Sequence, residues 1–155
     1  MNNSIDETNR AILERLVDGR ESFRVIAEAV GVTENTVRAR IQKMRSESVL
    51  EIGGRVDPEM VPGVEVVFVG VKLDSMRLSE KAEELSLLPG VVSSCVVTGR
   101  FDIMLIVFLT PERDLLEFYK NEMATVEGVA SVETFVVYEG RGLSLLWSTI
   151  LGNGD

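Results

Sequence analysis

The stretch SFRVIAEAVGVTENTVRARIQKM, residues 22–44, contains two short segments of helical hydrophobic periodicity separated by Gly31. Ser22 stands just before the first segment and Thr33 just before the second, and both residue types are favourable helix N-caps. A glycine at position 31 tolerates the left-handed backbone that a sharp turn between two helices needs. The stretch therefore predicts a helix-turn-helix that the rest of the chain positions.

The second segment of this motif has one apolar face and one polar face. Val37, Ile41 and Met44 fall at i, i+4 and i+7, so they face inward. The opposite face carries small or hydrogen-bonding side chains with cations at its edges, which suits base edges and phosphates in the major groove. We therefore predict that the protein binds double-stranded DNA through this helix. The predicted DNA-contacting residues are Thr33, Asn35, Thr36, Arg38, Ala39, Arg40 and Lys43.

Local charge favours DNA binding over the alternative, an ordinary solvated helix face rich in arginine. Residues 34–46 contain four cations and one acid, whereas the whole chain has a formal net charge of -9. A positive patch on an acidic protein is typical of nucleic-acid binding. Arg40 has an alternative of its own, because its position beside the core also suits an internal ion pair with an acid such as Glu28.

Composition excludes several other classes of protein. The chain has no histidine and a single cysteine, Cys95. It therefore lacks the commonest general base, a histidine-based triad, imidazole zinc ligands and an internal disulfide. We expect neither an enzyme nor a bound cofactor or metal ion. The longest apolar run, residues 103–109, is far shorter than the roughly 18 residues of a membrane span, and the N-terminus lacks a signal-peptide core, so we expect a cytoplasmic protein.

Sequence on either side of the motif completes a first domain. Ser4 and Glu7 have the spacing of a capping box, which predicts a helix starting there. Its apolar stripe comprises Ile5, Ile12, Leu13 and Leu16. Residues 49–56 read VLEIGGRV, two short apolar stretches around a Gly-Gly pair, and predict a hairpin or wing. Residues 1–56 are thus predicted to form a winged helix-turn-helix domain, followed by a linker, residues 57–63, with two prolines.

A second domain follows in residues 64–151. Its pattern predicts the order β-α-β-β-α-β, the ferredoxin-like arrangement, and hence an α+β fold class for the chain. The predicted strands are residues 64–73, 91–98, 101–109 and 131–138, and the predicted helices are residues 78–87 and 111–126.

Two of these strands, residues 64–73 and 101–109, are apolar on both faces. Helices cover only one face of a ferredoxin-like sheet, so something else must cover the second. We expect a second copy of the same sheet, which makes the protein a homodimer. The alternative is that the apolar tail LSLLWSTIL, residues 143–151, folds back over this face; in the dimer it would join the interface as a short helix or a strand.

The two predicted domains together resemble the Lrp/AsnC family of feast/famine transcription regulators. Four segments in order carry the resemblance: IDETNRAIL (residues 5–13), VGVTENTVRARIQKM (30–44), VDPE (56–59) and VTGRFDIMLIV (97–107). The resemblance implies a DNA-binding dimer, often assembled into tetramers or octamers, with a small-molecule effector, commonly an amino acid, bound between subunits near residues 98–102. The chain departs from the family at Asn9, where an acid is usual, in the short Gly-rich stretch of residues 50–57, and in the tail.

The loop at residues 98–102 has features of its own. Gly99-Arg100 reads as a two-residue hairpin loop with the glycine that a type II′ turn demands. Backbone N–H groups of such a turn can receive a carboxylate, and Asp102 can receive an ammonium group. The alternative for Asp102 is an acid hydrogen-bonded to its own turn or paired with Arg100. The predicted effector-binding residues are Thr98, Gly99, Arg100, Phe101 and Asp102.

Two other functions fit the same architecture. One is a metabolite-sensing module with a vestigial helix-turn-helix. The other is an enzyme like those of a related branch that decarboxylates a haem precursor, which the absence of histidine disfavours.

Overall fold

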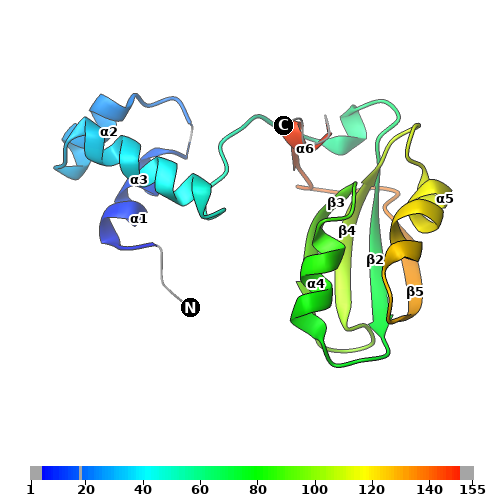
Figure 1. The fold of residues 1–155 in the computed structure, drawn as a ribbon. Helices are drawn as coiled ribbons and strands as arrows, with labels where there is room; N and C mark the ends of the chain where they lie inside the picture. Colours follow the sequence, from blue (N-terminus) through cyan, green and yellow to red (C-terminus); the bar gives the residue numbers. More distant parts are fainter. Residues whose placement is uncertain (1–4, 18, 151–155) are drawn as a thin grey trace. The chain divides into compact units, whose positions relative to one another are not determined.

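The computed structural model of the chain describes residues 5–17 and 19–150. The chain divides into two compact units between Ile52 and Gly53 (Figure 1).

The first unit consists of three helices, α1 (Glu7–Arg15), α2 (Phe23–Val30) and α3 (Glu34–Ser46). The predicted local signals are confirmed. The Ser22 hydroxyl accepts from the Val25 N–H, Gly31 has φ 77°, and the Thr33 hydroxyl accepts from the Thr36 N–H. One apolar face of each helix meets in the core, which consists of Ile12, Ile26, Ala27, Val37, Ile41 and Met44.

The start of α1 differs from the predicted capping box. The N-cap is Asp6, whose carboxylate accepts from the Asn9 N–H at 2.7 Å. Glu7 is therefore the first residue of the helix, too early to take the glutamate position of a capping box. Ser4 lies outside the described residues.

The predicted wing hairpin is wrong. Val49 and Leu50 instead pack against the three-helix core, and both of their N–H groups donate to the carbonyl of Met44. The next strand, β1 (Arg55–Val56), pairs in antiparallel fashion with β6 (Leu145–Leu146) rather than with a neighbour in sequence. Because residues 49–50 are held by the first unit, residues 53–56 find a partner in the second unit, to which they belong.

The second unit contains a four-stranded antiparallel sheet. Its strands are β2 (Glu65–Leu73), β3 (Val91–Val96), β4 (Ile103–Leu109) and β5 (Val129–Val136), in the order β3-β4-β2-β5. Helix α4 (Leu78–Ser86) connects β2 to β3, and a helical segment connects β4 to β5. The predicted β-α-β-β-α-β arrangement and α+β fold class are confirmed.

Two connecting segments differ in detail from their predictions. The linker holds a 3-10 turn, η1 (Pro58–Met60), capped by Asp57. The second helical segment begins at Asp114, whose carboxylate caps it, and not at Pro111, because a bridge between Thr110 and Arg113 extends the loop after β4. This segment runs through α5 (Leu115–Glu117), the π turn η2 (Phe118–Glu122) and the 3-10 turn η3 (Met123–Thr125).

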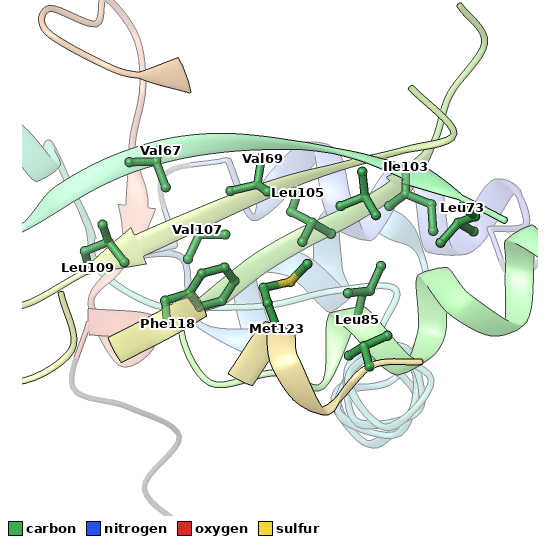
Figure 2. Packing of buried hydrophobic residues seen from close by; sticks show 12 residues of the cluster. Val67, Val69, Leu73, Leu85, Ile103, Leu105, Val107, Leu109, Phe118 and Met123 are labelled. Carbon is green, nitrogen blue, oxygen red and sulfur yellow. The ribbon is translucent and has the colours of Figure 1, made fainter. Parts of the chain in front are cut away.

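One face of the sheet packs against the helices and forms the main core. Figure 2 shows Leu85 of α4 and Phe118 and Met123 of the second helical segment pointing at the strands. The strand residues that meet them are Val67, Val69, Val71, Leu73, Ile103, Leu105, Val107 and Leu109.

The second face of the sheet is covered at its two ends. At one end the tail lies over it, since Leu145 of β6 is buried against Val66 and Phe108. A short helix, α6 (Trp147–Ile150), follows β6. At the other end Phe101 lies over Gly70. The area between stays open, with Phe68, Met104 and Ile106 half-buried and Phe135 42% exposed; we call these four side chains the open sheet face.

Candidate DNA-binding surface and effector loop

The exposed face of α3 contains most of the predicted DNA-contacting residues. Asn35, Ala39 and Lys43 are solvent-exposed, and so is Gln42, which lies on the same face. The buried side of the helix consists of Val37, Ile41 and Met44, as the spacing predicts. The exposed face thus presents an amide, a methyl group and a second amide in successive turns, the side-chain types that contact base edges.

Two predicted residues, Thr33 and Thr36, are used in the helix cap. The Thr33 hydroxyl accepts from the Thr36 N–H at 3.1 Å, and the two hydroxyls share a hydrogen bond of 2.8 Å. Their side chains are therefore fixed at the start of α3. Because one hydroxyl proton is used between them, one of the two hydroxyls can still donate outward.

The cations of this face are paired with acids at the surface. Arg38 contacts Glu34 at 2.8 Å and lies over the Phe23 ring at 5.2 Å. Lys43 contacts Glu47 at 3.8 Å. Exposed pairs of this kind contribute about 0–1 kcal/mol, so a DNA phosphate can replace the carboxylate at little cost.

Arg40 differs from the other cations of α3. Its Nη1 donates to Asp6 Oδ2 at 2.6 Å and to Asn9 Oδ1 at 2.9 Å. Asn9 is buried, and the Arg40 guanidinium holds the pKa of Asp6 below its usual value. The geometry thus favours the internal ion pair over a phosphate contact. The acid is Asp6 rather than Glu28, which contacts Arg24.

The loop between β3 and β4 is longer than predicted. The last register pair is Val96 with Ile103, and the Val97 N–H donates to the Asp102 carbonyl at 3.0 Å, so residues 97–102 form the loop. The predicted two-residue type II′ turn is wrong. The physical reason is that Asp102 is bonded to β2, because its N–H donates to the Val71 carbonyl at 2.9 Å and its carboxylate accepts from the Leu73 N–H at 2.9 Å.

Both carboxylate oxygens of Asp102 are engaged. The Leu73 N–H donates to Asp102 Oδ2, and the Lys72 ammonium donates to Asp102 Oδ1 at 2.8 Å. The Leu73 N–H first, and Lys72 second, hold the pKa of Asp102 below its usual value. Asp102 therefore ties the loop to β2, a role that matches neither alternative predicted for it.

Phe101 and Arg100 form a cluster with β5 over the second face of the sheet. The Phe101 ring contacts Phe135 edge-on at 6.0 Å and covers Gly70, where an added Cβ would lie 2.6 Å from the ring. Arg100 lies over the Phe101 ring at 5.4 Å and contacts Glu133 at 2.5 Å. Thr98 and Gly99 are exposed. Sequence reasoning missed Glu133 and Phe135, because only the register of β5 against β2 brings them to the loop.

A hollow beside this cluster was also not predicted. It has a volume of about 730 Å³ and is lined by Phe68, Phe135 and residues 136–143. Arg141 and Glu139, which pair at 2.6 Å, lie at its edge. In the described part of the chain, no three His, Cys, Asp or Glu side chains are grouped to hold a metal ion, and no helix is long and apolar enough to cross a membrane.

Comparisons with known proteins identify the family. Residues 5–45 match the AsnC-type helix-turn-helix domain, and residues 66–141 match the Lrp/AsnC ligand-binding domain. An uncharacterised HTH-type transcriptional regulator of Pyrococcus abyssi is 33% identical over 86% of this chain and 85% of the relative. The chain belongs to the Lrp/AsnC family.

Solved structures of the Lrp/AsnC family have the same fold. Escherichia coli AsnC is 26% identical with a TM-score of 0.61, over 90% of this chain and 95% of that protein. A feast or famine regulatory protein of M. tuberculosis, solved with L-methionine, is 21% identical with a TM-score of 0.63, over 87% and 92% of the two chains. These matches identify a transcription regulator with a ligand-binding domain, and they favour neither the sensing module nor the decarboxylase.

Proposed function

We propose that this Lrp/AsnC regulator binds specific double-stranded DNA sequences as a homodimer through the exposed face of α3, and that an amino acid regulates it. The observation that carries the proposal is the row Asn35, Ala39 and Gln42, exposed along α3 and backed by a fully packed core. Arg38 and Lys43 flank the row and supply phosphate contacts.

Binding to DNA is tested with duplexes selected from a random library by the full chain. We expect Asn35→Ala to reduce discrimination at one base pair by about 1–3 kcal/mol and Lys43→Ala to weaken all sequences alike, lowering the salt slope by about one. Lys120→Ala, which removes an exposed cation of the second unit, is the matched control and should leave binding unchanged. Unchanged binding by both α3 variants would show that α3 does not contact DNA.

The open sheet face supports the homodimer. Four large apolar side chains in one area, with covered ends, are typical of an interface. We expect Met104→Glu to dissociate the dimer in sedimentation experiments, because a buried unpaired carboxylate is costly. Leu116→Glu, at an exposed position of α5, is the control. Larger assemblies, tetramers or octamers, would appear as further species in the same experiment, and a parent chain that sediments as a monomer would contradict the proposal.

The effector site is proposed at the loop between β3 and β4. The relative solved with L-methionine supports an amino acid as the ligand. Arg100 and Glu133 form an exposed pair that offers one cation to a carboxylate and one anion to an ammonium group. Backbone N–H groups of residues 98–100 add donors for the carboxylate, and Phe101 adds an apolar surface.

Calorimetry with the twenty amino acids tests this site. We expect Arg100→Gln to weaken binding of the effector while the protein remains folded. Asp102→Asn serves as the comparison, since Asp102 is held by Lys72 and Leu73. If Asp102→Asn abolishes binding in a folded protein and Arg100→Gln does not, the ligand contacts Asp102 as the sequence alone suggests.

A further inference from the structure

The C-terminal segment of the chain pairs with the segment that enters the second unit. Strand β1 lies antiparallel to β6 with Arg55 opposite Leu146 and Val56 opposite Leu145. The Trp147 N–H donates to the Gly54 carbonyl at 2.8 Å. Figure 1 shows α6 beside the segment that leads into β2. We call residues 53–56 and 144–147 together the clasp.

Side chains reinforce the clasp. Arg55 donates through Nε to the Ser144 hydroxyl at 2.9 Å and through Nη2 to the Ser144 carbonyl at 2.5 Å. Gly53 lies against Leu146, whose Cδ2 would be 3.1 Å from an added Cβ. Two backbone pairs, one further backbone hydrogen bond and a two-point arginine contact therefore hold eight residues together.

The clasp is fixed to the sheet. Leu145 is 4% exposed and packs against Val66 of β2 and Phe108 of β4. Because β6 is held on the sheet through Leu145, β1 is held there as well. The tail thus anchors the start of the second unit, although it is the last described part of the chain.

This anchoring shortens the connection between the two units. The Leu50 N–H donates to the Met44 carbonyl at 3.1 Å, so the first unit holds the chain up to Leu50. On the other side, Gly54 is the first clasp residue with a backbone hydrogen bond, so residues 51–53 connect the two units. With the clasp open, the next fixed residue is Asp57, which caps η1 next to buried Pro58, and residues 51–56 become the connection.

We propose that the clasp sets the length of the tether between the DNA-binding unit and the second unit, and thereby the half-site spacing that a dimer accepts. The inference rests on the proposed function, a dimer that binds DNA. Three further residues per subunit add up to about 10 Å of reach, the rise of about three base pairs. Opening the clasp doubles the length of the tether, from three residues to six. This lowers the effective concentration of the dimer's second DNA-binding unit by about threefold, because this concentration falls as the -3/2 power of tether length.

The test is a full-length variant whose clasp can be closed by a disulfide. Arg55→Cys and Leu146→Cys replace a pair of register partners, whose Cα separation in an antiparallel ladder suits a disulfide, in a Cys95→Ser background. The reduced protein lacks both Arg55 hydrogen bonds, whereas the oxidised protein has its clasp locked. One protein therefore provides both states, and the Cys95→Ser chain is the control.

Two measurements follow. Thermolysin should cleave within residues 51–56 about tenfold faster in the reduced protein than in the Cys95→Ser control, as expected after loss of two hydrogen bonds. In the oxidised protein the disulfide holds the clasp closed, so cleavage should return to the control rate or below. On selected duplexes whose half-site separation varies in single base pairs, the oxidised protein should keep the control's preferred spacing. The reduced protein should discriminate about threefold less than the control between the preferred half-site spacing and the neighbouring spacings.

The outcomes separate the inference from the proposed function. Failure of the disulfide to form, or equal cleavage in both redox states, would show that the tail does not hold the linker. Different cleavage with identical spacing preferences would refute the role in DNA binding. If the control protein selects no DNA sequence, the proposed function fails, and the cleavage rates alone then decide whether the clasp exists.

Discussion

Substitution of Gly70 by alanine should reveal how the loop between β3 and β4 is held on the sheet. Gly70 lies in the middle of β2, and a Cβ there would meet three ring atoms of Phe101 at 2.6, 2.7 and 2.7 Å. Ordinary carbon–carbon contacts are about 3.5–4.0 Å, so the ring must retreat by about 1 Å. Gly70→Ala therefore forces Phe101 away from its edge-on contact with Phe135.

Three contributions set the size of the effect. Overpacking costs about 1–3 kcal/mol, and loss of the aromatic pair costs about 0.5–1.5 kcal/mol. Replacing glycine within a strand recovers about 0.5–1 kcal/mol of backbone entropy. Since the ring has a path outward to solvent, we take the low end of the packing term and expect Gly70→Ala to lower the free energy of unfolding by about 1–2 kcal/mol.

The decisive measurement repeats the substitution in a Phe101→Ala background. With the ring gone, the three contacts shorter than 3 Å disappear and the entropy term remains, so Gly70→Ala should now stabilise the protein by about 0.5–1 kcal/mol. Urea unfolding at fixed protein concentration, followed by the fluorescence of Trp147 in the second unit, gives both values. An equal effect of Gly70→Ala in both backgrounds would refute the contact between Gly70 and Phe101.

Three further predictions concern single positions. Because the pKa of Asp102 is lowered in the folded protein, its contribution to stability is complete above its unfolded pKa and is lost as pH falls through its folded pKa. The urea concentration at the unfolding midpoint should therefore decrease once the pH is lowered below about 4, and it should decrease less steeply in Asp102→Asn. Ser48 has φ 54°, so Ser48→Gly should raise the free energy of unfolding by about 0.5–1 kcal/mol in thermal or urea unfolding. Arg40→Gln should weaken DNA binding by displacing α3 from α1 while leaving the salt slope unchanged, unlike Lys43→Ala; a slope that falls by about one would show a phosphate contact instead.

Features encoded within a few residues were predictable from sequence. Ser22, Gly31 and Thr33 act on the helix that each one starts or ends, so their residue types suffice to place the turn. The order of strands and helices was predictable for the same reason, since each element has its own hydrophobic period.

Features that depend on distant partners were not predictable. Asp6 and Arg40 are 34 residues apart, and Arg55 and Ser144 are 89 apart, so no local pattern joins them. The same holds for the loop between β3 and β4, residues 97–102, whose length depends on the pairing of Asp102 with β2. In each case a polar group had several chemically equivalent partners in the sequence, and only the packed fold selects one.

The cations of α3 illustrate how the fold divides similar residues between structure and function. Arg38 is paired with Glu34 and Lys43 with Glu47, each partner lying four residues away, and such exposed pairs contribute about 0.2–0.5 kcal/mol. A phosphate can therefore replace either carboxylate at little cost. Arg40 instead bonds both the cap of α1 and buried Asn9, so releasing it would break two hydrogen bonds that join α3 to α1, one of them to a buried amide oxygen. The cation nearest the core thus fixes the orientation of α3, whereas the weakly paired cations at its edges are the ones that we propose contact DNA phosphates.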